Sequence, residues 1–233
     1  MLIKSAILTQ ASGSVGGMTA SRNRGGMYFR ARAIPTDPKS ALQLERRTSL
    51  AVAAAAWGAL SEEQRDSWNL YGLNVTMKNA LGDPIQLSGQ QHWLRFQTAY
   101  LLTNTAVTLT AASPGFSLPD APNITTAAAT NDDQVTVTLG AASGTWASNT
   151  TSRLLVFVSR AVEATQAAPA SHFRFAGSVA GAATPPASFA FDYTTIWGVS
   201  YTLGQRIWLR FRVITTNALS PVTNLGPVQV VTT

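Results

Sequence analysis

The stretch RIWLRFRVI, residues 206–214, shows most directly how this chain folds. Aliphatic or phenylalanine side chains alternate with arginine or tryptophan, and this two-residue period is that of a β-strand with one buried face. The apolar residues of one side are expected to face a core: Ile207, Leu209, Phe211 and Val213. The residues of the other side are expected to face outward: Arg206, Trp208, Arg210 and Arg212.

Similar short stretches fill residues 123–233 and are separated by Gly, Pro, Asn and Ser turns. Besides 206–214, the candidate strands are a short one near Ile124, then Gln134–Leu139, Arg153–Ala161, His172–Ala176, Ser188–Tyr193 and Val228–Thr232. Short strands spaced in this way predict a C-terminal antiparallel β-sandwich of the immunoglobulin-like or fibronectin type III kind.

A linker is expected at residues 112–122, where prolines and a glycine interrupt regular structure. Before it, residues 36–111 predict a small helical docking segment. Thr36-Asp37-Pro38 is a helix-start pattern with proline at the first helical position. Ser61-Glu62-Glu63-Gln64 predicts a capping box that opens a second helix, which Gly72 is expected to close.

Ser88-Gly89-Gln90-Gln91 predicts the start of a third helix in the same way. This helix is expected to carry Trp93, Phe96, Tyr100 and Leu101 on an apolar face. Four side chains are expected to pack where the first two helices meet: Trp57, Leu60, Trp68 and Tyr71.

Residues 1–35 are expected to form a basic, Gly- and Arg-rich extended arm. The first 50 residues hold eight basic side chains against two acidic ones, whereas residues 51–233 hold nine of each. The whole excess behind the net charge of +6 therefore lies in the first fifth of the chain. MYFRARAI, residues 27–34, alternates as a strand does, which predicts Tyr28, Arg30 and Arg32 on one face and Phe29, Ala31 and Ala33 on the other. SGSVGG, residues 12–17, lacks the ending of a phosphate-binding loop, and we expect a flexible glycine hinge there.

Side chains able to carry catalysis are few. The chain has no cysteine, and its two histidines, His92 and His172, fall in different predicted segments. The Asp132-Asp133 pair predicts a turn, and Glu62-Glu63 suits a helix N-terminus. We therefore expect no catalytic residues, no cofactor and no metal site, and we expect that the chain is not an enzyme. No run approaches the ~18 apolar residues of a membrane span, so no membrane partner is expected.

The arm supplies the candidate functional site, a set of six residues expected to bind a partner: Arg22, Arg24, Tyr28, Phe29, Arg30 and Arg32. Arginines interleaved with aromatic rings can contact nucleic-acid phosphates and stack on bases. They can equally pair with an acidic protein surface. We favour the protein partner because the rest of the chain carries no net charge to extend a nucleic-acid footprint.

Three spaced patterns in residues 13–102 resemble a group of uncharacterised bacteriophage and prophage proteins. They are Gly16-Gly17-Met18-Thr19-Ala20-Ser21-Arg22-Asn23-Arg24-Gly25-Gly26, then Tyr28-x-Arg30-x-Arg32-x-x-Pro35-x-x-Pro38, then Trp57-x-x-Leu60-Ser61-x-x-Gln64-Arg65-x-x-Trp68. The chain departs from the usual form with Asp37 where that group commonly has Asn and Ser61 where it has Thr. Both changes keep a helix-capping side chain.

The resemblance implies an accessory virion component, such as a capsid decoration or cement protein or a neck- or tail-associated protein, docked through its N-terminal half. The expected location is the virion, and the expected partners are other virion structural proteins, with the chain present as a homo-oligomer or in several copies. A nucleic-acid-binding protein that uses the Arg-rich arm is the alternative. A glycan hydrolase is a weaker one, since Glu163 and Asp192 are the only carboxylates of residues 134–233.

Overall fold

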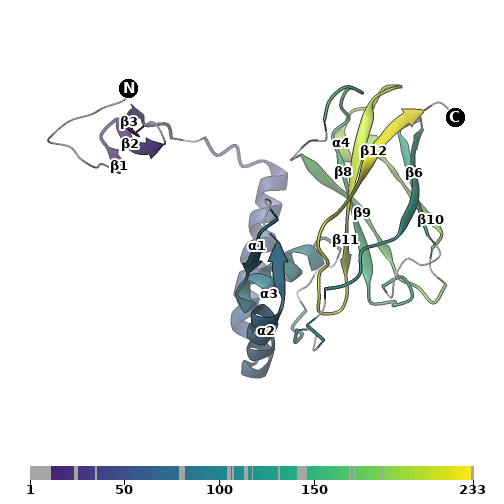
Figure 1. Cartoon of the computed structure of the whole chain (residues 1–233), viewed down its shortest axis with the longest axis horizontal. Coiled ribbons are helices and arrows are strands. Elements are labelled where there is room, and N and C mark those ends of the chain that lie inside the picture. Colours follow the sequence, from purple (N-terminus) through teal and green to yellow (C-terminus); the bar gives the residue numbers. More distant parts are fainter. Residues whose placement is uncertain are drawn as a thin grey trace. The chain divides into compact units, whose positions relative to one another are not determined.

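The computed structural model describes residues 12–23, 26–34, 36–78, 82–103, 106, 108–112, 115–116, 118–130, 132–140, 146–167, 169, 172–184 and 186–231. The chain divides into two compact units, Met1–Leu44 and Glu45–Thr233. The described residues form a mixed α+β structure with four helices and mostly antiparallel sheets (Figure 1). The finer division into segments 1–35, 36–111, 112–122 and 123–233 stays a prediction.

The first unit contains a three-stranded antiparallel sheet in the order β1-β2-β3. Its strands are β1 (Gly13–Val15), β2 (Met18–Asn23) and β3 (Gly26–Ala31). Gly16 and Gly17 form the turn between β1 and β2, and Gly16 has a φ of +57°, a conformation that glycine adopts without a Cβ clash. The predicted flexible hinge is therefore wrong, because these glycines make the tight turn of a hairpin.

The helical segment comprises α1 (Ala41–Ala59), α2 (Glu62–Asn74) and α3 (Gly89–Tyr100), with the hairpin β4 (Thr76–Lys78) and β5 (Pro84–Gln86) between α2 and α3. Both predicted capping boxes are confirmed. Ser61 and Ser88 each accept a hydrogen bond from the backbone N–H three residues ahead, and a glutamine side chain reaches back to each cap.

Two predicted helix ends are wrong. The first helix begins at Ala41 rather than Pro38, because Lys39 has a φ of +46° and cannot continue a right-handed helix. Gly72 lies inside α2 instead of closing it, and the helix runs to Asn74. The role of this glycine is close packing, since a Cβ on Gly72 would lie 2.8 Å from the backbone N of Gly89 and the backbone O of Leu87.

Aromatic side chains fill the core of the helical segment. Trp68 and Trp93 are buried, with ring centroids 5.6 Å apart and nearly perpendicular planes, and Phe96 lies 5.7 Å from Trp68. The predicted packing of Trp68, Leu60 and Tyr71 is confirmed, and Trp57 joins the same cluster as a half-buried member.

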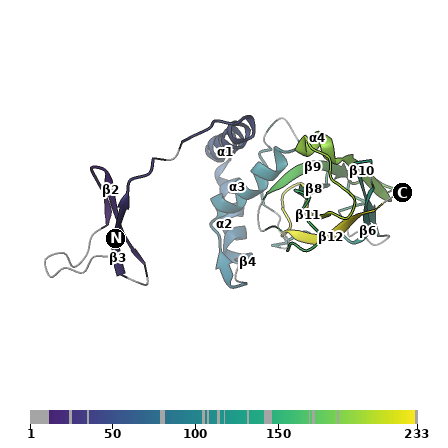
Figure 2. The ribbon, with the colours of Figure 1, turned by 90° about the horizontal axis from the view of Figure 1, so that it is seen from above.

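The second unit also contains a seven-stranded sheet, called the C-terminal sheet, in the order β10-β7-β6-β12-β11-β8-β9. Its strands are β6 (Ile124–Thr130), β7 (Gln134–Leu139), β8 (Arg153–Ser159), β9 (Phe173–Ala180), β10 (Ser188–Asp192), β11 (Arg206–Ile214) and β12 (Thr223–Val231). Neighbouring strands pair antiparallel except β12 and β6, which pair parallel. A short helix, α4 (Tyr193–Trp197), follows β10. Figure 2 shows the strands folded around a shared interior.

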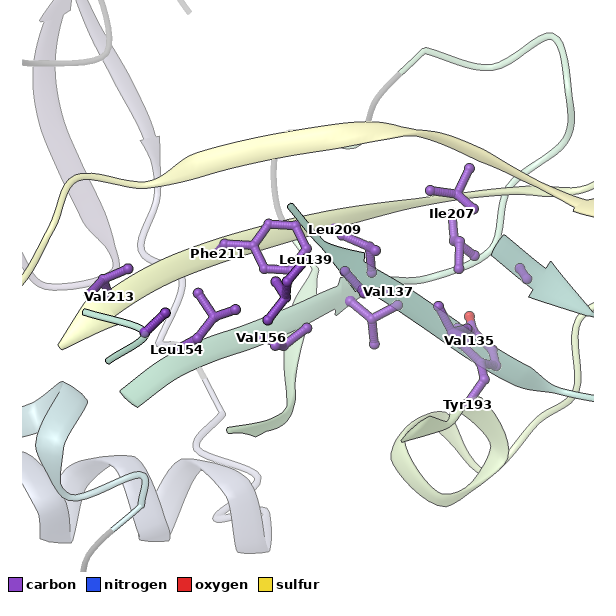
Figure 3. Packing of buried hydrophobic residues seen from close by; sticks show 14 of the residues in the cluster. Val135, Val137, Leu139, Leu154, Val156, Tyr193, Ile207, Leu209, Phe211 and Val213 are labelled. Atoms are coloured by element: carbon purple, nitrogen blue, oxygen red, sulfur yellow. The ribbon is translucent and has the colours of Figure 1, made fainter. Parts of the chain in front are cut away.

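That interior is an apolar core built from alternate residues of several strands (Figure 3). The four side chains of β11 predicted to face a core are each fully buried there. They lie with side chains of β7 and β8, among them Val135, Val137, Leu154 and Val156, and with Tyr193 of α4. The strict alternation read from RIWLRFRVI is confirmed on this side.

The other side of β11 does not face open solvent as predicted. Trp208 is only 8% exposed. Arg212 lies opposite Leu155 on β8, and Leu155 packs in the same cluster as Trp68 and Trp93 of the helical segment. The outward prediction for Trp208 is wrong because its side chain is almost fully buried, and alternation along one strand cannot indicate what covers the second face of a sheet.

Candidate functional site

The sheet of the arm has one predominantly apolar face. In antiparallel strands, residues directly opposite one another share a face. The register places Arg22 opposite Met27, Ala20 opposite Phe29 and Met18 opposite Ala31, and Val15 on β1 pairs with Met18. We call this set the apolar face of the arm: Val15, Met18, Ala20, Arg22, Met27, Phe29 and Ala31.

The opposite face is polar. Tyr28 lies opposite Ser21, and Arg30 lies opposite Thr19, whose hydroxyl is 2.8 Å from the hydroxyl of Ser14. Arg32 follows two positions after Arg30, so the alternation continues on the same side, and its backbone N–H donates to the carbonyl oxygen of Gly17 at 2.8 Å. We call this set the polar face of the arm: Ser14, Thr19, Ser21, Tyr28, Arg30 and Arg32.

The six predicted partner-binding residues are therefore not brought together on one surface. Arg22 and Phe29 belong to the apolar face, and Tyr28, Arg30 and Arg32 belong to the polar face. The three arginines are exposed, and both aromatic residues are half-buried. Arg24, the sixth, lies outside the described residues. Both faces of the small sheet thus present arginine.

Large apolar side chains of the arm remain open to solvent. Val15 is 86% exposed and Met18 is 52% exposed, although Met27 on the same face is buried. Ile34, just beyond β3, is 78% exposed. Exposed apolar side chains gathered on one face are typical of a surface that a partner covers.

The two histidines occupy unrelated positions. His92 is buried in α3 with its ring 5.1 Å from that of Tyr71 in an edge-to-face arrangement, so it packs in the helical core. Burial lowers the pKa of His92, and the positive charge of Arg95 lowers it further. His172 immediately precedes β9 with a φ of +69°.

The carboxylates singled out in the sequence take part in local hydrogen bonds. Asp192 is the N-cap of α4 and accepts a hydrogen bond from the backbone N–H of Thr194 at 2.8 Å. Asp132 accepts a hydrogen bond from the hydroxyl of Thr130 in the turn before β7. A side-chain hydrogen bond from Thr194 lowers the pKa of Asp192, and one from Thr130 lowers that of Asp132. Glu163 accepts from the amide of Gln205 at 3.3 Å.

Within the part of the chain that the structure describes, no group of three or more His, Asp or Glu side chains is arranged to hold a metal ion. Among the same residues, none of the helices combines the length and apolar character needed to cross a bilayer.

Sequence inspection missed a second group of cations. Lys78, Arg95, Arg210 and Arg212 line one cavity of the second unit. Arg210 and Arg212 were assigned to the outward side of a strand, and no role was expected for Arg95. No signal in the sequence marks Arg95, because helical spacing places it off the face that carries Trp93, Phe96 and Tyr100.

No protein-family model matches the chain. No curated protein matches it at a significant level. Among solved structures, it is similar to the crystal structure of domains A168-A170 from titin, with 16% sequence identity and a TM-score of 0.30. The match covers 49% of this chain and 33% of the titin chain, so this chain spans about a third of the length of that structure. A similarity at this level does not establish a shared fold.

Proposed function

We propose that the chain is a non-enzymatic structural protein of a phage particle, an accessory virion component that docks on a protein partner through its N-terminal arm. The observation that carries the proposal is the apolar face of the arm, on which Val15 and Met18 are open to solvent and Arg22 lies further along β2. The assignment to a phage particle rests on the resemblance of residues 13–102 to phage and prophage proteins.

An apolar face favours a protein partner over nucleic acid. Covering a Val or Met side chain contributes about 1.5–3 kcal/mol when burial is complete. A phosphate backbone attracts arginine but offers no apolar surface to receive Val15 and Met18. The complementary surface is an apolar patch with a carboxylate near its rim, where Arg22 can form a charge-assisted, bidentate pair.

The polar face supports a second candidate function. Tyr28 and Arg30 lie on one side of β3, and Arg32 follows just beyond the strand. A row of arginine with an aromatic ring suits single-stranded or duplex nucleic acid. This candidate leaves the apolar face without a role, which is why it ranks second.

We further propose that the C-terminal sheet is an immunoglobulin-like sandwich of the fibronectin type III kind. With the strands lettered A, B, C, C′, E, F and G in chain order, the observed order splits into an A-B-E half and a C′-C-F-G half. This arrangement of antiparallel strands around one core supports that assignment. Such modules project from many assemblies, so this part does not specify the function.

Several copies in one assembly are consistent with the arm. In the described sheet, β1 and β3 are the outer strands, and an outer strand offers backbone N–H and C=O groups to a neighbour. A copy or a different particle protein can extend the sheet there while it covers the apolar face.

The test is incorporation into particles. Particles would be purified from the phage or induced prophage whose genome encodes the chain, and the chain would be quantified by mass spectrometry. We expect the unchanged chain to be incorporated and the double variant Val15→Asp/Met18→Asp to fold but to be excluded, because each carboxylate would be buried without a partner. The matched control is Val199→Asp/Leu203→Asp, which alters residues that are 47% and 58% exposed in the second unit.

Incorporation of the control variant but not the arm variant supports the proposal. Particles that lack the unchanged chain, or that take up the arm variant as well as the unchanged chain, contradict it.

A further inference from the structure

A cavity of about 890 Å³ lies in the second unit. Side chains from the β4–β5 hairpin, α3, β11 and the start of β12 line it, so it forms where the helical segment meets the C-terminal sheet. Lys78, Pro221 and Val222 in its lining are exposed, and the cavity therefore reaches the surface. Its volume lies in the range of about 300–1,000 Å³ that is usual for small-molecule sites.

The charged lining of the cavity has one sign. Lys78, Arg95, Arg210 and Arg212 all contribute to it, and the described lining residues include no Asp or Glu. Burial, together with the nearby charge of Arg212, lowers the pKa of Arg95 to about 10. Burial also lowers the pKa of Arg212, with Arg210 adding to the effect. A pKa of about 10 leaves Arg95 charged at neutral pH, so partly buried like charges repel one another here.

Two of the guanidinium groups are held in defined positions. Arg95 donates from Nη1 to the carbonyl oxygen of Leu219 at 3.2 Å and from Nη2 to that of Ser220 at 2.8 Å. These acceptors are neutral, so they orient the group and leave its charge in place. Arg210 lies over the ring of Phe173 at 3.7 Å from the centroid and donates from Nε to Oδ1 of Asn224 at 2.9 Å.

The rest of the wall is largely apolar. Met77 and Ile85 from the hairpin, Leu87 before α3, and Leu118 face the same cavity as the arginines. A site of this composition suits a ligand with two parts, one negatively charged and one apolar. A bare inorganic anion would leave the apolar wall in contact with water.

We propose that this cavity binds an anionic ligand whose carboxylate or phosphate group is attached to an apolar body. The anion lies among Arg95, Arg210 and Arg212, and the apolar body lies against the wall that includes Met77, Ile85 and Leu118. The inference is independent of the arm, which belongs to the other unit. A small amphiphile and an acidic side chain within an apolar protein segment share this chemistry.

Calorimetric titration of the full chain tests the proposal with four small probes: octyl phosphate, octanoate, inorganic phosphate and octanol. The first two carry both parts of the ligand, and the last two carry one part each. We expect saturable binding of octyl phosphate or octanoate, and at least tenfold weaker binding of inorganic phosphate and of octanol. A blocked acidic peptide, acetyl-Glu-Leu-Glu-Leu-amide, distinguishes the two sources: binding tighter than octanoate assigns the ligand to a protein segment, and weaker binding assigns it to a small molecule.

Three variants locate the site. Arg212→Gln removes one charge-assisted contact and is expected to weaken binding by about tenfold to a hundredfold. Lys78→Gln changes an exposed residue that does not support the fold, and it is expected to weaken binding by a smaller factor because its charge is screened. Arg206→Gln is the matched control, since Arg206 lies on the same strand and side as Arg212 but does not line the cavity.

Absence of saturable binding to octyl phosphate and octanoate would overturn the proposal. So would equal affinities in the unchanged chain, Lys78→Gln and a folded Arg212→Gln, because the probe would then bind elsewhere. If Arg212→Gln does not fold, the other two variants are compared. Weaker probe binding by Lys78→Gln than by Arg206→Gln supports the proposal, and equal binding by the two contradicts it.

Discussion

The indole N–H of Trp68 donates a hydrogen bond to the carbonyl oxygen of Thr110 at 2.9 Å. Two neighbouring bonds repeat the connection: the amide of Gln64 donates to the carbonyl oxygen of Leu109 at 2.8 Å, and the backbone N–H of Ala112 donates to the hydroxyl of Ser67 at 3.0 Å. One side of α2 thus holds residues 109–112, which lead from the helices toward the C-terminal sheet. Trp68 is at the centre of both this connection and the aromatic core.

Replacing Trp68 with Ala is therefore expected to lower the free energy of unfolding by about 3 kcal/mol or more. The residue is 1% exposed, and its removal leaves a large cavity and an unpaired carbonyl at Thr110. Urea unfolding followed by circular dichroism measures the loss. Trp57→Ala is the control. Because Trp57 is half-buried, its replacement should lower the free energy of unfolding by clearly less. Equal losses in the two variants would contradict this assignment.

The capping box at Ser61 predicts a specific response to substitution. Ser61→Ala removes the acceptor for the backbone N–H of Gln64 and should cost about 1 kcal/mol of unfolding free energy. Ser61→Thr keeps a hydroxyl in the same place and should stay close to the unchanged chain. Denaturant midpoints of the three proteins provide the comparison. A threonine variant as unstable as the alanine variant would show that the hydroxyl is not the stabilising group.

Two glycines of the helical segment should respond in opposite directions to alanine. At Gly72 the added Cβ would lie 2.8 Å from the backbone of Leu87 and of Gly89. Moving these segments apart should lower the free energy of unfolding by about 1–3 kcal/mol. At Gly58, in α1, a Cβ meets nothing within 4 Å, so Gly58→Ala should stabilise the chain by about 0.5 kcal/mol through helix propensity. Thermal unfolding of both variants tests the pair, and a stabilising Gly72→Ala would refute the close packing.

Stability should fall in mild acid because of His92. Burial lowers the pKa of His92 in the folded chain below its unfolded value of about 6.5. Above pH 6.5 the imidazole is neutral in both states. As the pH falls below 6.5, the unfolded state takes up a proton that the folded state does not, so the unfolding free energy decreases until the pH passes the folded pKa.

Unfolding free energies measured between pH 8 and pH 5 test this point. The decrease should become smaller in His92→Phe, which retains an aromatic ring against Tyr71. It should remain in His172→Gln, because His172 is outside this core. A His92→Phe variant with an unchanged pH dependence would contradict the assignment.

Local features of the fold could be predicted from the sequence because their causes are local. Ser61 and Ser88 form their capping boxes within three residues, and the burial of Ile207 and Phe211 follows from strand alternation. The roles of Trp208 and Gly72 could not be predicted in this way. Both depend on packing between parts of the chain that are not adjacent in sequence, as with the residues before α3 that lie over Gly72.

The candidate site shows the same distinction. Alternation in MYFRARAI predicts that Tyr28, Arg30 and Arg32 share a side, and the pairing of β2 with β3 agrees for Tyr28 and Arg30. Arg22 could not be assigned to a face, because its side depends on the register between β2 and β3. The cavity with Arg95 and Arg212 combines residues from α3 and β11, far apart in the chain, and only the tertiary structure brings them together.

The central claim is that the arm docks on protein rather than on nucleic acid, and duplex DNA binding by the purified chain tests it most directly. The comparison includes the unchanged chain, the variant Arg22→Gln/Arg30→Gln/Arg32→Gln, and the control Arg65→Gln/Arg160→Gln/Arg206→Gln, which removes three arginines outside the arm. At ~0.15 M salt we expect all three to bind weakly and alike, with dissociation constants well above a micromolar. Micromolar or tighter binding that weakens steeply with salt, and is lost only in the arm variant, would contradict the account.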